Sequence, residues 1–117
     1  MKKIISLIVC ALLLTACDSK GYETIDSDVA MTLIEQNAIV IDVRTIEEYN
    51  DGHIEGSINI PVDNIANITY NKEDIIILYC ASGMRSSNAA KTLIDLGYTN
   101  VYNLDGGLIN WGFDLVE

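Results

Sequence analysis

Apolar and polar positions follow one another along this chain in a way that predicts short strands separated by helices. The clearest strand covers residues 75–79, Ile-Ile-Ile-Leu-Tyr, an unbroken apolar run typical of a strand covered on both faces in a parallel sheet. Further short β-rich runs occur at residues 22–25, 38–43, 57–60 and 101–104. Because helical patterns and short connections separate these runs, the sequence predicts a three-layer α/β domain with a mostly parallel sheet of about five strands.

Helix start signals lie between the predicted strands. Asp26 or Ser27 can cap a first helix that ends near Asn37. Thr45 and Glu48 form the capping-box pattern of a short second helix. Short helices are also predicted at residues 62–68 and 108–111. This order of elements brings the carboxyl ends of the strands to one edge of the sheet, where ligands bind in open α/β folds.

The turn after the central strand carries the candidate chemistry. Cys80 ends the strand, and residues 86–88, Ser-Ser-Asn, are helix-capping types that precede a helical pattern. A helix N-terminus has free amides and a positive dipole end, which attract anions. If residues 81–86 curl around the Cys80 sulfur, the thiol pKa falls below its ordinary value of about 8.5. Gly83 gives the loop backbone freedom and Arg85 adds a positive charge, so the sequence predicts a charged, accessible sulfur nucleophile.

Two other interpretations of this turn exist. Cys80 could be a buried cysteine with no reactivity, because free cysteine is among the residue types most often buried. Phosphate or arsenate chemistry is disfavoured by loop length, since tyrosine phosphatases and related enzymes have five residues between cysteine and arginine. Here four residues separate Cys80 from Arg85, which leaves the ring one residue short for phosphate.

Four stretches of the chain together resemble the single-domain rhodaneses, which are sulfurtransferases. The active-site loop of that family is similar to Cys80-Ala81-Ser82-Gly83-Met84-Arg85-Ser86. The other three stretches are Ile41-Asp42-Val43-Arg44 followed by Glu47-Glu48-Tyr49, the segment from Gly52 to Pro61, and Leu104-Asp105-Gly106-Gly107 with Trp111. The similarity runs from about Tyr22 to Trp111, and four blocks in the right order are far more specific than one loop.

The resemblance implies a two-step sulfur transfer. The Cys80 thiolate attacks the outer sulfur of thiosulfate or of a persulfide or polysulfide donor, and the resulting Cys80 persulfide passes its sulfur to cyanide or a thiol. Arg85 is expected to hold the donor's oxyanion. The loop amides are expected to hold the substrate; they belong to Ala81, Ser82, Gly83, Met84, Arg85 and Ser86. The alternative function is a non-catalytic, membrane-tethered rhodanese-like binding or sensing module.

The loop composition favours one donor class over another. Family members that favour thiosulfate tend to have basic residues early in the loop, whereas this chain has Ala81 and Ser82 there. A weaker hold on a doubly charged donor is therefore expected. A persulfide or polysulfide is the better candidate for the physiological donor.

Asp42 and Arg44 lie at the C-terminal end of the second predicted strand and are expected to border and support the Cys80 pocket. Arg44 is also expected to form an ion pair with Glu47 or Glu48. His53 is the one histidine of the chain and could act as a general base, but in rhodanese-like chains the corresponding turn resembles a packing feature. With no second histidine to build a metal site, no metal and no cofactor are expected.

The first 17 residues have the features of a bacterial lipoprotein signal. Lys2 and Lys3 precede an apolar stretch of eleven residues, well short of the roughly 20 that a membrane-spanning helix needs. The segment Leu14-Thr15-Ala16-Cys17 resembles a lipobox, in which Cys17 is lipidated. We therefore predict a signal peptide at 1–16, a lipidated N-terminus and linker at 17–21, and a rhodanese-like domain at 22–117. Asp18, next to Cys17, resembles an inner-membrane retention signal of bacterial lipoproteins, so the domain is expected on the outer face of the inner membrane, in the periplasm.

Cysteine count and charge narrow the expected partners. Once Cys10 is removed and Cys17 is acylated, Cys80 is the only free thiol, so no internal disulfide is possible. The exported part keeps five basic residues against 17 acidic ones, which argues against nucleic acid as a partner. The expected partners are a small sulfur donor, a thiol or cyanide acceptor and the membrane, and the chain is expected to be a monomer.

Overall fold

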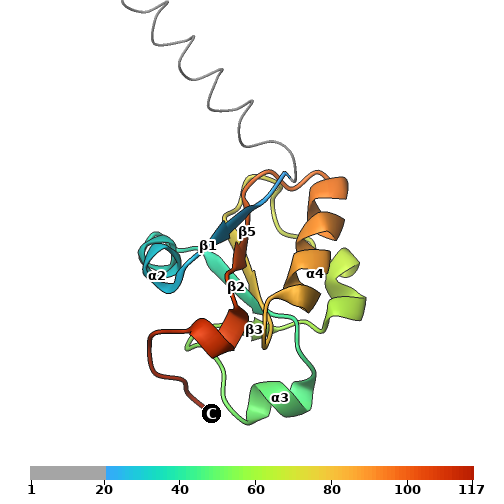
Figure 1. Ribbon diagram of the computed structural model, residues 1–117. Helices are drawn as coiled ribbons and strands as arrows, with labels where there is room; N and C mark the ends of the chain where they lie inside the picture. The colour runs from blue at the N-terminus through green and yellow to red at the C-terminus, as the bar shows by residue number, and fades with distance from the viewer. Residues whose placement is uncertain (1–20) are drawn as a thin grey trace, which may run out of the picture.

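The computed structural model describes residues 21–117, in which five parallel strands form one sheet in the order β1-β5-β4-β2-β3 (Figure 1). The strands are β1 (Glu23–Ile25), β2 (Ile39–Asp42), β3 (Ile58–Asn59), β4 (Ile76–Tyr79) and β5 (Val101–Leu104). This confirms the predicted parallel α/β architecture. The predicted signal peptide and the lipidation at Cys17 lie outside the described residues.

Helices cover both faces of the sheet. In Figure 1, α2 lies on one side of the strands, while α4 lies on the other side and α3 lies beyond the end of the sheet near β3. The helices are α2 (Ser27–Glu35), α3 (Ile46–Asn50) and α4 (Met84–Asp95), and the 3₁₀ helices are η1 (Val62–Asn67) and η2 (Gly107–Asn110). Within residues 21–117, none of the helices has the length and apolar content needed to cross a membrane.

Local sequence signals account for most helix boundaries. The Asp26 side chain caps α2 by accepting a hydrogen bond from the Val29 amide at 2.9 Å, and Asn37 takes a left-handed φ of 71° after the helix. The capping box of Thr45 and Glu48 is present at the start of α3. These features confirm the predicted starts of both helices.

The start of α4 differs from the prediction. The helix begins at Met84, and its N-cap is Gly83 with a φ of 103°, a left-handed conformation that favours glycine. Gly83 therefore turns the chain into the helix without a side-chain cap. As a consequence Ser86 lies in the first turn of α4, where its hydroxyl is directed at the loop and does not cap the helix.

Strand β4 is the centre of the core. Ile76 and Leu78 pack into the apolar cluster on the α4 side, whereas Ile77 and Tyr79 pack into the cluster on the α2 side. All four side chains are fully buried, as the apolar run predicted. Close packing on both faces holds the end of β4, and therefore Cys80, in a fixed position.

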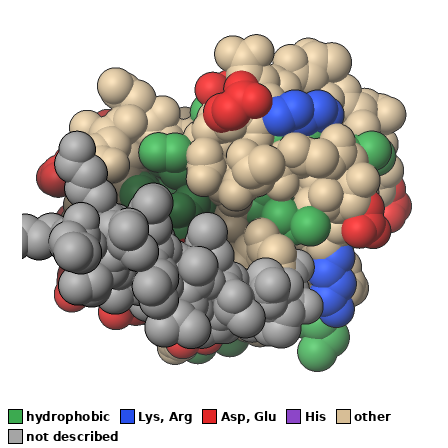
Figure 2. Space-filling view, turned by 90° about the horizontal axis from the view of Figure 1, so that it is seen from above, with side chains coloured by type: hydrophobic (Ala, Val, Ile, Leu, Met, Phe, Trp, Pro, Cys, Tyr) green, Lys and Arg blue, Asp and Glu red, His purple; other side chains and the backbone are tan. Residues whose placement is uncertain are grey.

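Charged side chains are dispersed over the face drawn in Figure 2. Lys and Arg side chains form two small patches there, each next to acidic side chains. A wide basic surface, which a nucleic-acid partner would require, is absent from the described residues on this face.

Candidate active site

The loop after β4 folds around the Cys80 sulfur. The Gly83 amide donates a hydrogen bond to Cys80 Sγ at 3.0 Å, and the Ser86 Oγ lies 3.5 Å from the same sulfur. The predicted curl of the backbone around the sulfur is therefore present. Cys80 itself is only 1% exposed, so the prediction of an accessible sulfur is wrong for this conformation.

The loop lowers the pKa of the Cys80 thiol. Burial raises this pKa, but hydrogen bonds from the Ser86 hydroxyl and from the amides of Ser86, Ser82 and Gly83 outweigh the burial and lower it overall. These donors stabilise the negative charge of a thiolate more than they stabilise a neutral thiol. The site thus favours the reactive, ionised form of cysteine.

We expect a titration of Cys80, followed by its ultraviolet thiolate absorbance, to give an apparent pKa below the ordinary value of about 8.5. The spectrum of a Cys80→Ser variant is subtracted to remove the absorbance of every group other than Cys80. Replacing Ser86 with alanine should raise the apparent pKa, because the variant lacks the hydroxyl donor. An apparent pKa of Cys80 at or above the ordinary value would show that burial dominates.

Asn103 supports the loop from β5, a role that the sequence did not indicate. The Ser86 hydroxyl contacts Asn103 Oδ1 and also lies 3.2 Å from the Gly83 carbonyl. The side-chain amide nitrogen of Asn103, Nδ2, donates to that same carbonyl at 3.4 Å. A hydroxyl has one proton, so Ser86 donates to only one of Asn103, Gly83 and the Cys80 sulfur at a time. Asn103 therefore sets how available this proton is to the sulfur.

The turn after β5 is hydrogen-bonded to the backbone of the Cys80 loop. The Leu108 amide donates to the Cys80 carbonyl at 3.0 Å, and the Ile109 amide donates to the Ala81 carbonyl at 3.2 Å. These bonds require close approach of Gly107, where a Cβ atom would lie 2.2 Å from the Cys80 carbonyl oxygen. The absence of a side chain at Gly107 therefore permits the close approach of this turn to the active-site loop.

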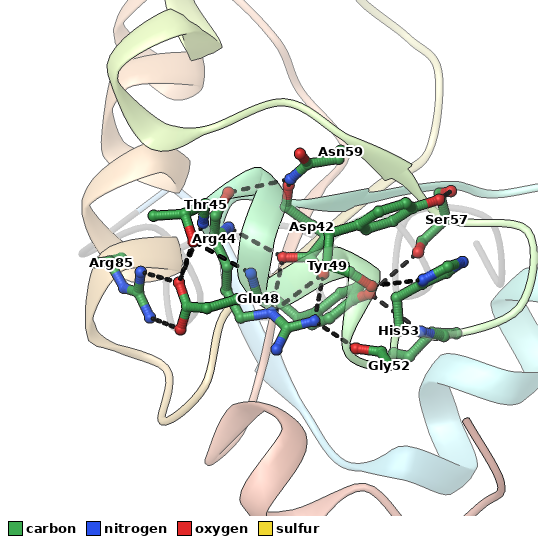
Figure 3. Close-up of polar contacts among 12 residues, drawn as sticks. Asp42, Arg44, Thr45, Glu48, Tyr49, Gly52, His53, Ser57, Asn59 and Arg85 are labelled. Carbon is green, nitrogen blue, oxygen red and sulfur yellow. Dashed lines mark hydrogen bonds and ion pairs between the residues drawn. The ribbon is translucent and has the colours of Figure 1, made fainter. Parts of the chain in front are cut away.

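Arg85 pairs with Glu48 across 37 residues of sequence. Its Nη1 and Nη2 atoms donate to the two carboxylate oxygens of Glu48 at 2.9 and 3.1 Å (Figure 3). The prediction that Arg44 pairs with Glu47 or Glu48 is therefore wrong. Sequence proximity suggested that pairing, but the sheet brings the start of α4 next to α3.

Arg44 instead pairs with Asp42. Arg44 Nη2 lies 2.7 Å from Asp42 Oδ2, and the same nitrogen donates to the Gly52 carbonyl at 2.7 Å (Figure 3). Burial lowers the pKa of Arg44, but Asp42 outweighs the burial and raises it. The pair fixes the corner between β2 and the turn after α3. Support of the Cys80 pocket by this pair stays a prediction.

His53 has contacts of a packing residue. Its ring stacks on Tyr49 with centroids 3.7 Å apart, and its Nδ1 lies 2.8 Å from the Tyr49 carbonyl. Its backbone pairs with Val116 near the C-terminus. These contacts match the packing role that the resemblance implied.

The chain is similar in sequence and in structure to known proteins. The family model described as "Rhodanese-like domain" matches residues 26–113. The chain is 37% identical over 81 residues to thiosulfate sulfurtransferase GlpE of Pseudoalteromonas translucida, covering 68% of this chain and 77% of that protein. It is 40% identical over 70 residues to thiosulfate sulfurtransferase PspE of Escherichia coli, covering 56% and 67%. The crystal structure of a rhodanese-related protein from Thermoplasma volcanium superposes with a TM-score of 0.72 at 30% identity, covering 81% and 98%.

Proposed function

This chain belongs to the rhodanese-like domain family, and from this membership we propose that it is a sulfurtransferase whose nucleophile is Cys80. The donor is thiosulfate or a persulfide or polysulfide, and the acceptor is cyanide or a thiol. The single observation that carries this proposal is the hydrogen bond from the Gly83 amide to the Cys80 sulfur, within a loop that lowers the pKa of the thiol.

The reaction has two steps. With thiosulfate, the Cys80 thiolate attacks the outer sulfur, the S–S bond of the donor breaks, and sulfite leaves with the electron pair. In the second step the acceptor attacks the outer sulfur of the Cys80 persulfide and restores the thiolate. The amides of Ser82, Gly83 and Ser86 stabilise the negative sulfur in both steps, because they already point at it before reaction. Covalent catalysis of this kind gives ping-pong kinetics.

Lipid anchoring at Cys17 belongs to the same proposal. The lipobox-like segment that ends at Cys17 supports an exported protein held at a bacterial membrane, with its domain in the periplasm. Several acyl chains anchor a protein far more firmly than one chain does. The domain then transfers sulfur close to the membrane surface.

Intact-mass analysis of the full-length protein tests the proposal. After treatment with thiosulfate or an organic persulfide, we expect a gain of one sulfur atom, and peptide mapping should place it on Cys80. Adding cyanide should remove the sulfur and produce thiocyanate. If neither donor adds sulfur to Cys80 in the folded protein, the non-catalytic binding or sensing module becomes the better interpretation.

A further inference from the structure

Glu48 has no part in the two-step reaction, yet it lies at the substrate-binding arginine. Its Oε1 accepts hydrogen bonds from Thr45, at 3.0 Å from the backbone amide and 3.2 Å from the hydroxyl, and both carboxylate oxygens accept from Arg85 (Figure 3). Mainly because of the Arg85 hydrogen bonds, the pKa of Glu48 is lowered to about 2. Glu48 is therefore fixed in place and negatively charged at any physiological pH.

The ion pair changes what Arg85 offers to a substrate. The guanidinium already makes two parallel hydrogen bonds to a carboxylate, the geometry that it would use for an oxyanion. An anionic donor must displace Glu48 or bind beside it. A second negative charge on the donor then meets a like charge within a few ångströms, where salt screens little.

The described residues supply little other positive charge to the loop. Arg44 is paired with Asp42, and Lys72 lies over the Tyr98 ring. The remaining described cation, Lys91, lies two turns further along α4 than the loop. The positive side-chain charge that would help to bind a dianion is therefore either paired with a carboxylate or distant from the loop.

Two exposed apolar side chains lie next to the loop. Met84 is 75% exposed and Ile109 is 76% exposed, the two highest values among the exposed large hydrophobic residues of the described chain. Met84 belongs to the loop, and the Ile109 amide bonds to the Ala81 carbonyl, so both residues lie beside it. An organic group on the donor can bury apolar surface against these side chains.

We propose that Glu48 is a specificity-determining positioning residue, whose ion pair with Arg85 makes the site select monoanionic sulfur donors with an organic group over small dianions such as thiosulfate. This inference rests on the proposed function. It extends that function by assigning the donor class to a residue outside the Cys80 loop.

The chemical step is the same for the selected donors. The Cys80 thiolate attacks the outer sulfur, an Sγ–S bond forms, and the bond between that sulfur and the rest of the donor breaks. The leaving group departs with the electron pair, as a sulfinate from an organic thiosulfonate or as a thiolate from an organic persulfide. A neutral sulfur atom is transferred, so the step requires no external oxidant or reductant.

A comparison of two donors in the full-length protein tests the role of Glu48. Thiosulfate is a dianion, and methanethiosulfonate is a monoanion in which a methyl group replaces one oxygen. We expect Glu48→Gln to shift the ratio of kcat/KM values about fivefold toward thiosulfate, mainly through a lower KM for thiosulfate. The matched control is Glu47→Gln, which removes one negative charge from the neighbouring position of α3 and should leave the ratio within about twofold.

A double-variant cycle separates competition for Arg85 from a general charge effect. In an Arg85→Ala background, Glu48→Gln should shift the donor ratio less than it does with Arg85 present, because the group for which donor and Glu48 compete is absent and only the like-charge repulsion remains. An unchanged ratio in Glu48→Gln, a shift toward methanethiosulfonate, or an equal shift in Glu47→Gln would each overturn this inference while leaving sulfur transfer intact. Absence of turnover with both donors in the unmodified protein would overturn the proposed function itself.

Discussion

Replacing Cys80 with serine is expected to abolish sulfur transfer, with a loss of about 1,000-fold or more in kcat/KM. Serine is close to cysteine in size, and its hydroxyl can accept the Gly83 amide hydrogen bond that the sulfur now accepts. A neutral hydroxyl is a poor nucleophile toward sulfur, so no persulfide forms. Thiocyanate production from cyanide, with thiosulfate and methanethiosulfonate as donors, measures the loss, and intact mass checks for bound sulfur.

The matched control for this variant is Cys17→Ser. It removes the predicted lipidation site and therefore changes membrane anchoring, but it should retain sulfur transfer in solution because Cys17 takes no part in the two-step reaction. Thermal unfolding of both variants shows whether the fold is kept. If the Cys80→Ser variant is folded and still transfers sulfur at a comparable rate, Cys80 is not the nucleophile.

Replacing Gly107 with alanine is expected to destabilise the fold by about 3 kcal/mol or more. The new Cβ would lie 2.2 Å from the Cys80 carbonyl oxygen and 2.8 Å from the Ala81 carbonyl carbon and oxygen. All of these are backbone atoms, which cannot rotate away as a side chain would. Gly107 also has a φ of 58°, which favours glycine. Unfolding in denaturant, monitored by circular dichroism, measures the loss of stability.

Gly56→Ala is the matched control for the steric part of this effect. Gly56 has a φ of 83°, but a Cβ there would have no heavy atom within 4 Å. We expect a loss of about 1 kcal/mol from backbone conformation alone. Equal destabilisation by the two substitutions would mean that the turn after β5 moves away from the Cys80 loop at little cost.

The sequence predicted the sheet and the position of Cys80 after its central strand because both depend on local patterns. An apolar run such as residues 75–79 is a strong strand signal, and the five predicted strands are present. The capping box at Thr45 was equally readable, because its partners are three residues apart. Short-range hydrogen bonds and the burial of a strand can be predicted because they depend on residues that are neighbours in the sequence.

The parts that the sequence did not predict depend on side chains brought together by the fold. Glu48 and Arg85 are 37 residues apart, and Ser86 and Asn103 are 17 residues apart. Charge alone did not identify the cation that pairs with Glu48. Arg44, the arginine nearest to it in sequence, was expected, but the partner is Arg85. The burial of Cys80 was also missed, because a loop sequence does not reveal how closely the following segments cover it.

The burial of Cys80 affects whether two chains can form a disulfide with each other in an oxidising compartment. A disulfide requires two cysteine Cα atoms to come within about 7 Å of each other. Each Cys80 lies beneath its own loop, with only 1% of its surface exposed. A disulfide between the Cys80 residues of two domains would therefore require both loops to open.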